Sequence, residues 1–206
     1  MQTALIIVLA AVIVAVLCCF LTFSGFVPFL LLILYLILNL AYSFGLKNFP
    51  IIDISILVSG FLIRILYGAV VTQITISNWL YLTVISLAFY FALGKRRNEA
   101  KQLANAQTRK VLKSYPINFL DKNMGMFLAL ANVFYALWSM DSKTVSSYET
   151  EYLIFTVPIV WLITLKYSLS VEGDSDGDPV EVLLHDKVLM LLCALYAVCM
   201  LAILYF

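Results

Sequence analysis

The chain has 206 residues, of which 64% are hydrophobic and only 12% are charged. Soluble domains carry about 25% charged residues, so this composition excludes an ordinary water-soluble protein and indicates a membrane protein. The formal net charge is +1, and nothing in the sequence suggests that the chain binds nucleic acid.

Seven apolar stretches are long enough to cross a membrane: residues 4–23, 26–44, 51–71, 77–94, 123–140, 151–168 and 187–206. A bilayer core of about 30 Å needs about 20 apolar residues per helix. All seven are predicted to be helices, because a backbone in lipid must satisfy its own hydrogen bonds. We therefore predict an all-α, polytopic membrane helix bundle that forms one domain over residues 1–206.

The first stretch, residues 4–23, has two interpretations. Its position would suit a signal peptide, and Cys18 and Cys19 faintly resemble a lipoprotein cleavage site. However, the residues MQT provide no positive charge before the apolar run, and no clear small-residue cleavage site follows it. We expect this stretch to be retained as a helix.

The basic residues predict the orientation of the bundle. Seven spans place eleven Lys and Arg residues of the loops on one side and only Lys143 on the other. Basic loops stay in the cytoplasm, so the first side is predicted to be cytoplasmic. Met1 then lies in the cytoplasm and Phe206 outside. We expect a multi-pass protein of a bacterial cell membrane.

The sequence gives little evidence for a metal site or for redox chemistry. All four cysteines lie in predicted spans, where they act as small hydrophobic residues, and no CxxC pair occurs. The segment DSDGD resembles a calcium loop, but Pro179 stands where that loop needs glycine and His185 where it needs glutamate. We predict no metal ligands in this chain.

A group of polar residues stands out between Tyr42 and Arg64, in the segment YSFGLKNFPIIDISILVSGFLIR. Charged groups at membrane depth are costly and usually mark function. Lys47 is predicted to lie near a helix N-terminus, which favours phosphate. In the plainer alternative, neither residue binds substrate: Lys47 extends its side chain to the membrane surface, and Asp53 stabilises the first turn of the next helix. The group suggests a cytoplasmic site for an anionic substrate.

Arg64 is predicted to point into the bundle. It follows Pro50 by about 21 Å along a helix, too deep for its side chain to reach the near surface easily. Asp53, Gly60 and Arg64 share one helical face, and Gly60 and Gly68 would allow a neighbouring helix to approach closely. Arg64 is either a ligand for an anion or a structural arginine paired inside the core.

Two further cytoplasmic loops carry charge. The first, residues 94–123, begins with GKRRNEA, and its Lys95 and Arg96 emerge directly from a span. Attraction to anionic lipid headgroups is an alternative role for its basic residues. The second loop, residues 170–188, ends with Asp186, where a negative side chain suits the start of the last helix.

Together these motifs resemble the UbiA prenyltransferase superfamily, and most closely its decaprenyl-phosphate phosphoribosyltransferase branch. The resemblance rests on four segments in the branch's order: YSFGLKNFPIIDISILVSGFLIRILYGA, ISNWLYLTVISLAFYFALGKRRNEA, RKVLKSYPINFLD and LKYSLSVEGDSDGDPVEVLLHDKVL. It implies a bundle around a cavity open to the cytoplasm and transfer of 5-phosphoribosyl from phosphoribosyl diphosphate to polyprenyl phosphate. The resemblance also implies a role in cell envelope biosynthesis.

Eight residues match the branch's YSxxLK motif, its following Asp and Arg, its GKRxxE motif and the acid before the last helix. The resemblance implies that these residues bind substrate, and it assigns no catalytic residue. They are Tyr42, Lys47, Asp53, Arg64, Lys95, Arg96, Glu99 and Asp186.

The sequence departs from the superfamily in three respects. It lacks the NDxxDxxxD motif that holds Mg²⁺ against the diphosphate, and it begins at about the family's third helix, so we expect seven spans instead of nine. Mg²⁺ is thus expected from the resemblance, but without ligands in this chain. In addition, Arg97 and Asn98 replace the usual aromatic–small pair. We expect the chain alone to bind diphosphate weakly and transfer poorly.

Three interpretations of function remain open. The chain is a phosphoribosyltransferase that works with a partner chain carrying the missing helices, or a UbiA-type prenyltransferase acting on another acceptor. Alternatively, it is a non-catalytic membrane remnant or scaffold. GKRRNEA follows the fourth predicted span in place of the second Asp-rich motif expected of prenyltransferases, and it therefore favours the phosphoribosyl branch.

Overall fold

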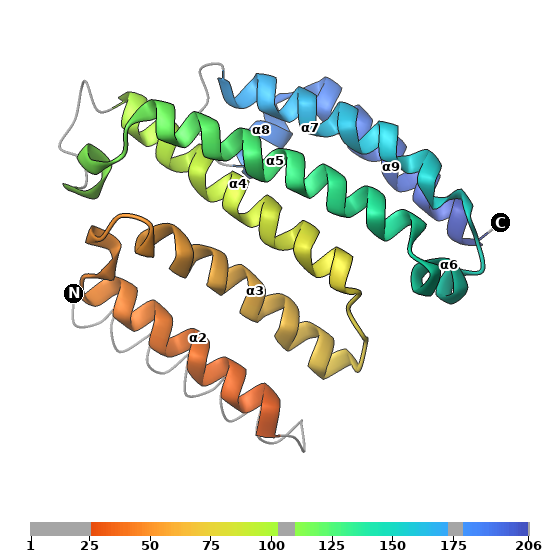
Figure 1. Cartoon of the computed structure of the whole chain (residues 1–206), viewed down its shortest axis with the longest axis horizontal. Coiled ribbons are helices and arrows are strands. Elements are labelled where there is room, and N and C mark those ends of the chain that lie inside the picture. Colours follow the sequence, from red (N-terminus) through yellow and green to blue (C-terminus); the bar gives the residue numbers. More distant parts are fainter. Residues whose placement is uncertain (1–25, 103–109, 173–178, 206) are drawn as a thin grey trace.

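The computed structural model describes residues 26–102, 110–172 and 179–205. In this part of the chain every regular element is a helix, and the long helices lie side by side (Figure 1). In chain order, with η for short 3-10 helices, they are α2 (Phe26–Phe44), η1 (Leu46–Asn48), α3 (Ile52–Thr72), α4 (Asn78–Gln102), η2 (Lys110–Ser114), α5 (Ile117–Met140), α6 (Ser142–Tyr148), η3 (Tyr152–Thr156), α7 (Val157–Glu172), α8 (Pro179–His185) and α9 (Lys187–Tyr205).

Five of the described segments are long and apolar enough to cross a membrane: Phe26–Phe44, Ile52–Thr72, Ile117–Met140, Tyr152–Glu172 and Lys187–Tyr205. Each overlaps one of the predicted spans, and the first of them has the predicted bounds. The prediction of an all-α, polytopic membrane bundle is therefore confirmed. The predicted span 4–23 lies outside the described residues.

α4 differs from the span predicted at residues 77–94. The helix continues to Gln102, so Lys95, Arg96 and Glu99 lie on its last turns and not in a loop. α4 is not among the five apolar segments, because tyrosine, serine, threonine and charged residues interrupt its sequence. Many of these polar residues are buried against neighbouring helices, where protein takes the place of lipid.

α5 also begins earlier than the predicted residue 123. Pro116 has an extended backbone directly before Ile117, and proline commonly precedes or opens a helix. Asp121 and Lys122 therefore lie in the second turn of α5. The prediction placed the boundary too late because it treated these charges as part of a loop, whereas helical ends tolerate them.

The helices are arranged in two groups on either side of α4. α2 and α3 form an antiparallel pair next to α4, while α5, α7 and α9 lie on its other side (Figure 1). α4 and α5 share the most extensive contact of the bundle. The larger buried cluster includes Val58, Tyr90, Leu93, Leu120 and Val171, from four of these helices. This packing brings the start of α3, the end of α4 and η2 together at one end of the bundle.

Candidate functional site

The connection between α2 and α3 forms the first part of the site. Gly45, with a φ of 146°, turns the chain out of α2 into η1, a conformation that suits glycine. Ile51 precedes α3 with a φ of 69°, which is unusual for a β-branched residue. α3 begins at Ile52, so Pro50 lies two residues before the helix.

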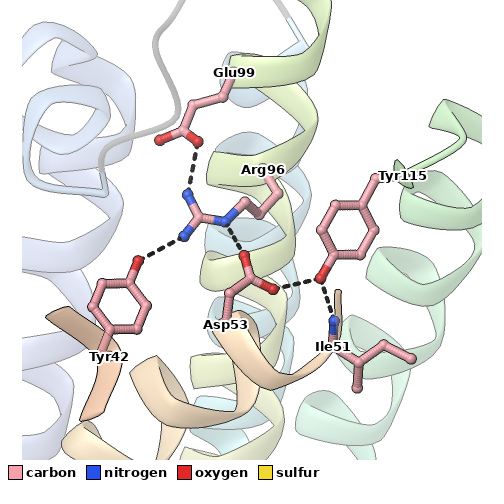
Figure 2. A network of polar contacts seen from close by, with 6 residues as sticks. All are labelled: Tyr42, Ile51, Asp53, Arg96, Glu99 and Tyr115. Carbon is pink, nitrogen blue, oxygen red and sulfur yellow. Dashed lines mark hydrogen bonds and ion pairs between the residues drawn. The ribbon is translucent and has the colours of Figure 1, made fainter. Parts of the chain in front are cut away.

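Arg96 is the centre of a buried polar network (Figure 2). Its Nε donates to Oδ2 of Asp53 at 2.7 Å, and its Nη1 donates to Oε2 of Glu99 at 2.7 Å. Its Nη2 donates to the Tyr42 hydroxyl at 3.2 Å. Arg96 is 1% exposed and Asp53 is fully buried. The network therefore joins α2, α3 and α4 through one guanidinium group.

Tyr115 completes the network from a third direction. Its hydroxyl donates to Oδ1 of Asp53 at 2.5 Å and accepts a hydrogen bond from the backbone N–H of Ile51, also at 2.5 Å. Tyr115 follows η2, which ends the connection between α4 and α5. One side chain therefore fixes both the strained Ile51 and the carboxylate of Asp53 (Figure 2).

The electrostatics keep Tyr115 in its protonated form. Burial, followed by the hydrogen bond to Asp53, raises the pKa of Tyr115 from 10 to about 12. Its hydroxyl therefore stays a donor to Asp53 at neutral pH. Two carboxylates surround one guanidinium, so the network of Asp53, Arg96 and Glu99 carries one net negative charge.

The two lysines of the predicted site lie around this network. Lys47 is half-buried on η1, which packs against the start of α3 and against η2. It forms no hydrogen bond or ion pair within the described ranges. Lys95 is exposed on α4, one residue before Arg96. The structure thus brings six of the eight predicted residues to one end of the bundle: Tyr42, Lys47, Asp53, Lys95, Arg96 and Glu99.

Arg64 does not join the network, and it does not point into the bundle as predicted. Its side chain is exposed, and its Nη2 donates to the Tyr35 hydroxyl of α2 at 2.5 Å. Asp53 and Arg64 bond to different helices, Asp53 to Arg96 of α4 and Arg64 to Tyr35 of α2, so a shared helical face does not bring them into one site. Gly60 does lie against Tyr35, since an added Cβ would meet its ring at 3.7 Å, but nothing lies within 4 Å at Gly68.

Asp186 belongs to a second polar cluster. Its Oδ1 accepts hydrogen bonds from the backbone N–H groups of Val188 and Leu189, which caps the start of α9. Its Oδ2 lies 2.7 Å from Nζ of Lys166 and accepts a hydrogen bond from Ser170. The contact with Lys166 has the largest effect, and together with the bonds from Ser170 and Leu189 it holds the pKa of Asp186 well below its usual range. Asp186 thus connects α7 to α9 through these contacts.

Arg97 and Asn98, the two residues that depart from the family motif, contact neighbouring helices. Nε of Arg97 donates to the Asp121 carboxylate of α5, and Nη2 lies 3.9 Å from Glu172 at the end of α7. Asn98 donates to the carbonyl of Val171 at 3.3 Å. Both residues are buried. They join the ends of α4, α5 and α7 at the same end of the bundle as Arg96.

Tyr115 is the member of the network that sequence reasoning missed. It lies in the segment RKVLKSYPINFLD, which contributed to the resemblance without any residue being singled out. The available signal was one tyrosine directly before a proline, in a polar segment that is predicted to be cytoplasmic. No spacing rule connects Tyr115 to Asp53, because 62 residues separate them.

An apolar cavity of about 470 Å³ lies among α4, α5, α7 and α9, away from the network. Its wall is mostly hydrophobic, and its polar side chains are tyrosines, two threonines and one asparagine. Its lining includes Leu87, Tyr90, Leu128, Tyr135, Ile163 and Cys193.

The residues of the site do not fit a magnesium ion. In the part of the chain that the structure describes, no three side chains of His, Cys, Asp or Glu come together as metal ligands. Both carboxylates of the network accept hydrogen bonds from Arg96, and a cation would have to compete with that guanidinium. Binding of Mg²⁺ stays a prediction from the resemblance.

Comparison with known proteins places this geometry in context. No protein-family model matches the chain. It is 33% identical to decaprenyl-phosphate phosphoribosyltransferase of Mycolicibacterium smegmatis, over 77% of this chain and 52% of that protein. It is 34% identical to the enzyme of the same name from Corynebacterium glutamicum, over 83% of this chain and 52% of that protein. The Mycobacterium tuberculosis enzyme is 32% identical over 79% of this chain.

The chain spans about half the length of these curated relatives. The similarity covers most of the chain itself, at a level of identity that indicates common ancestry. The chain is thus a homologue of the decaprenyl-phosphate phosphoribosyltransferases and belongs to that UbiA-type branch.

Proposed function

We propose that the chain takes part in the transfer of 5-phosphoribosyl from phosphoribosyl diphosphate to a polyprenyl phosphate. The observation that carries the proposal is the buried network around Arg96, built from residues that match the branch's motifs. The names of the homologues support the same reaction, since they are called decaprenyl-phosphate phosphoribosyltransferases.

In this reaction a phosphate oxygen of the lipid attacks the anomeric carbon of the ribose. The bond from that carbon to the diphosphate breaks, and diphosphate leaves with the electron pair. The protein must hold two anionic substrates close together and in line, which supplies much of the rate enhancement in such transfers. Mg²⁺ would offset the charge of the departing diphosphate if another segment or chain supplied its ligands.

Arg96 is a positioning residue in this proposal. Its three donor nitrogens are already engaged by Asp53, Glu99 and Tyr42, so it holds the ends of three helices in register. Lys47 and Lys95 are the proposed phosphate ligands, because Lys47 lies half-buried beside the network and Lys95 is exposed next to Arg96.

Glu99 is proposed to orient the ribose. Only its Oε2 accepts from Arg96, and its side chain remains 25% exposed, so Oε1 can accept a hydrogen bond from a sugar hydroxyl. The apolar cavity among α4, α5, α7 and α9 is the proposed seat for part of the polyprenyl chain.

The proposal is tested on membranes that contain this chain alone. Radiolabelled phosphoribosyl diphosphate, polyprenyl phosphate and Mg²⁺ are supplied, and label is measured in the lipid phase. We expect low but measurable transfer that falls by at least about tenfold in Lys47→Ala, because one charge-assisted phosphate contact is lost. Lys143→Ala, predicted to lie on the opposite side of the membrane, is the matched control and should leave transfer unchanged.

Two results would overturn the proposal. Absence of label with the unaltered chain, together with unchanged diphosphate binding in Lys47→Ala, would favour a non-catalytic membrane protein. Incorporation of a labelled prenyl group without incorporation of labelled phosphoribose would favour a prenyltransferase acting on another acceptor.

A further inference from the structure

Arg64 lies at the middle of the bundle's depth. It follows Ile52, the first residue of α3, by about 18 Å along the helix axis. Its hydrogen-bond partner Tyr35 is the central residue of α2, with nine residues on either side. Helical side chains lean toward the helix N-terminus, which carries the guanidinium away from the nearer, C-terminal end of α3. Arg64 therefore places a positive charge at the centre of two membrane-spanning helices.

The contacts of Arg64 leave its charge uncompensated. One N–H bonds to the Tyr35 hydroxyl, and the guanidinium carbon lies 5.2 Å from the ring centre of Tyr35 and 5.7 Å from that of Phe61. A guanidinium has five N–H donors, so most of them are available to another partner. In the described ranges no carboxylate forms an ion pair with Arg64, and its side chain is exposed on the outer face of α2 and α3.

This chain cannot supply the missing negative charge at that depth. Residues 1–52, 54–98, 122–140, 152–171 and 187–206 contain no aspartate or glutamate. Asp53, the acidic residue nearest in sequence, is buried against Arg96 near the end of the bundle. A second copy of the chain has the same composition and therefore lacks the charge as well.

We propose that Tyr35, Phe61 and Arg64 form a docking surface for a membrane helix from outside these 206 residues, and that this helix carries an aspartate or glutamate at mid-bilayer depth. Charge complementarity selects this occupant, because a charged side chain in a membrane span is normally paired inside protein. A carboxylate can accept two parallel N–H bonds from one guanidinium. Both aromatic rings lie close to the guanidinium, and the arginine side chain remains exposed. The surface is separate from the Arg96 network and does not depend on the proposed transferase activity.

The experiment measures association with synthetic membrane helices. The whole chain is reconstituted in lipid vesicles with apolar peptides of about 20 residues that carry a central Glu, Gln or Leu. Binding is read by energy transfer between labels on the chain and the peptide. We expect the Glu peptide to bind at least about tenfold more tightly than the Gln peptide. This comparison uses the unaltered chain, so it does not depend on the folding of a variant.

Variants of the chain then assign the effect to Arg64. In Arg64→Met the preference for Glu should disappear, Arg64→Lys should keep part of it, and Lys143→Met should keep all of it. Equal binding of the Glu and Gln peptides, or a preference that persists in Arg64→Met, would overturn the proposal.

A third measurement separates helix docking from an aqueous anion site. In a chain otherwise free of cysteine, Arg64→Cys should resist a charged thiol reagent and react with an apolar one. Rapid labelling by the charged reagent that inorganic diphosphate blocks would overturn the proposal, because it would place Arg64 in a water-filled anion site.

Discussion

Arg96 and Asp53 illustrate how a buried charge can be tolerated at the edge of a membrane bundle. Each group is almost entirely removed from solvent, and each has polar partners for most of its donor or acceptor positions. A buried pair of this kind adds little net stability over an apolar pair of similar volume, but removal of one partner leaves the other charge uncompensated. Replacing one residue of the pair should therefore lower the stability of the folded chain more than replacing both residues with apolar ones.

At this scale we predict the stability of three variants. Asp53→Leu should lower the free energy of unfolding by about 1–3 kcal/mol, because Arg96 and Tyr115 each lose a buried hydrogen-bond partner while Glu99 still pairs with Arg96. Combining Asp53→Leu with Arg96→Met should restore more than half of the loss. Denaturant titration of the purified protein in mixed micelles measures both, with Lys143→Met as a neutral control. A double variant as unstable as the sum of its single changes would contradict this account.

The sequence placed most of these residues in one candidate site, but not all. Asp53, Arg96 and Glu99 were found because charges next to apolar spans are rare and because motifs pointed to them. Arg64 was assigned to the same site from helical periodicity and from its match to the branch's motif. Periodicity describes faces of one helix, whereas the network is made by contacts among α2, α3, α4 and the residue after η2, which no spacing within a helix encodes.

Among the elements, the C-terminal end of α4 does the most to organise the site. Consecutive residues of its last turns reach different neighbours: Arg96 contacts α3 and α2, Arg97 contacts α5 and α7, and Asn98 contacts α7. Because successive helical residues point about 100° apart, three adjacent positions can hold helices on three sides. The polar residues that follow residue 94 therefore hold neighbouring helices against α4.

We predict that Arg97 couples α4 to α5. Arg97→Met should destabilise the chain by about 1–3 kcal/mol and speed hydrogen exchange in the first turns of α5, because the Asp121 contact is lost. Asp121→Asn should have a similar effect, and the double variant should cost clearly less than the two single costs combined. Exchange of α9 is the internal control. Additive costs would show that the two side chains act independently.

The element boundaries show what sequence reasoning can and cannot determine. The C-terminal end of α2 was predicted correctly because Gly45, which suits a turn out of a helix, directly follows Phe44. The C-terminal end of α4 and the start of α5 lie beyond the predicted spans because charged residues were taken to end a membrane span. In the structure Arg96, Arg97 and Asp121 pair with residues of other helices, and such partners cannot be identified from a local window.

At the scale of the whole molecule, the predicted orientation follows from the basic residues alone. The Arg96 network and most basic residues belong to the end of the bundle that contains η1 and the end of α4, whereas α6, with Lys143, lies at the other end (Figure 1). The all-α bundle could be predicted from composition and span length, since lipid leaves few other ways to satisfy a backbone. The grouping of helices around α4 could not, because it depends on packing between distant segments.

We predict that the network end faces the cytoplasm. In a chain otherwise free of cysteine, Ser146→Cys should react with a membrane-impermeant maleimide in intact cells, because α6 should lie outside. Asn48→Cys, in η1, should react only in inverted vesicles. The reverse pattern would contradict the predicted orientation, and labelling of both sites from one side would contradict the described arrangement of the bundle.

The separation of Asp53 and Arg96 along the chain has a consequence for biogenesis. The two residues are 43 positions apart, and Tyr115 follows later still. At a synthesis rate of about 5–20 residues per second, Asp53 leaves the ribosome roughly 2–9 s before its arginine. During that interval α3 has an unpaired carboxylate in its first turn, where the membrane surface still offers water. The early position of Asp53 in α3 therefore lets the helix enter the bilayer first and receive its counter-charge when α4 arrives.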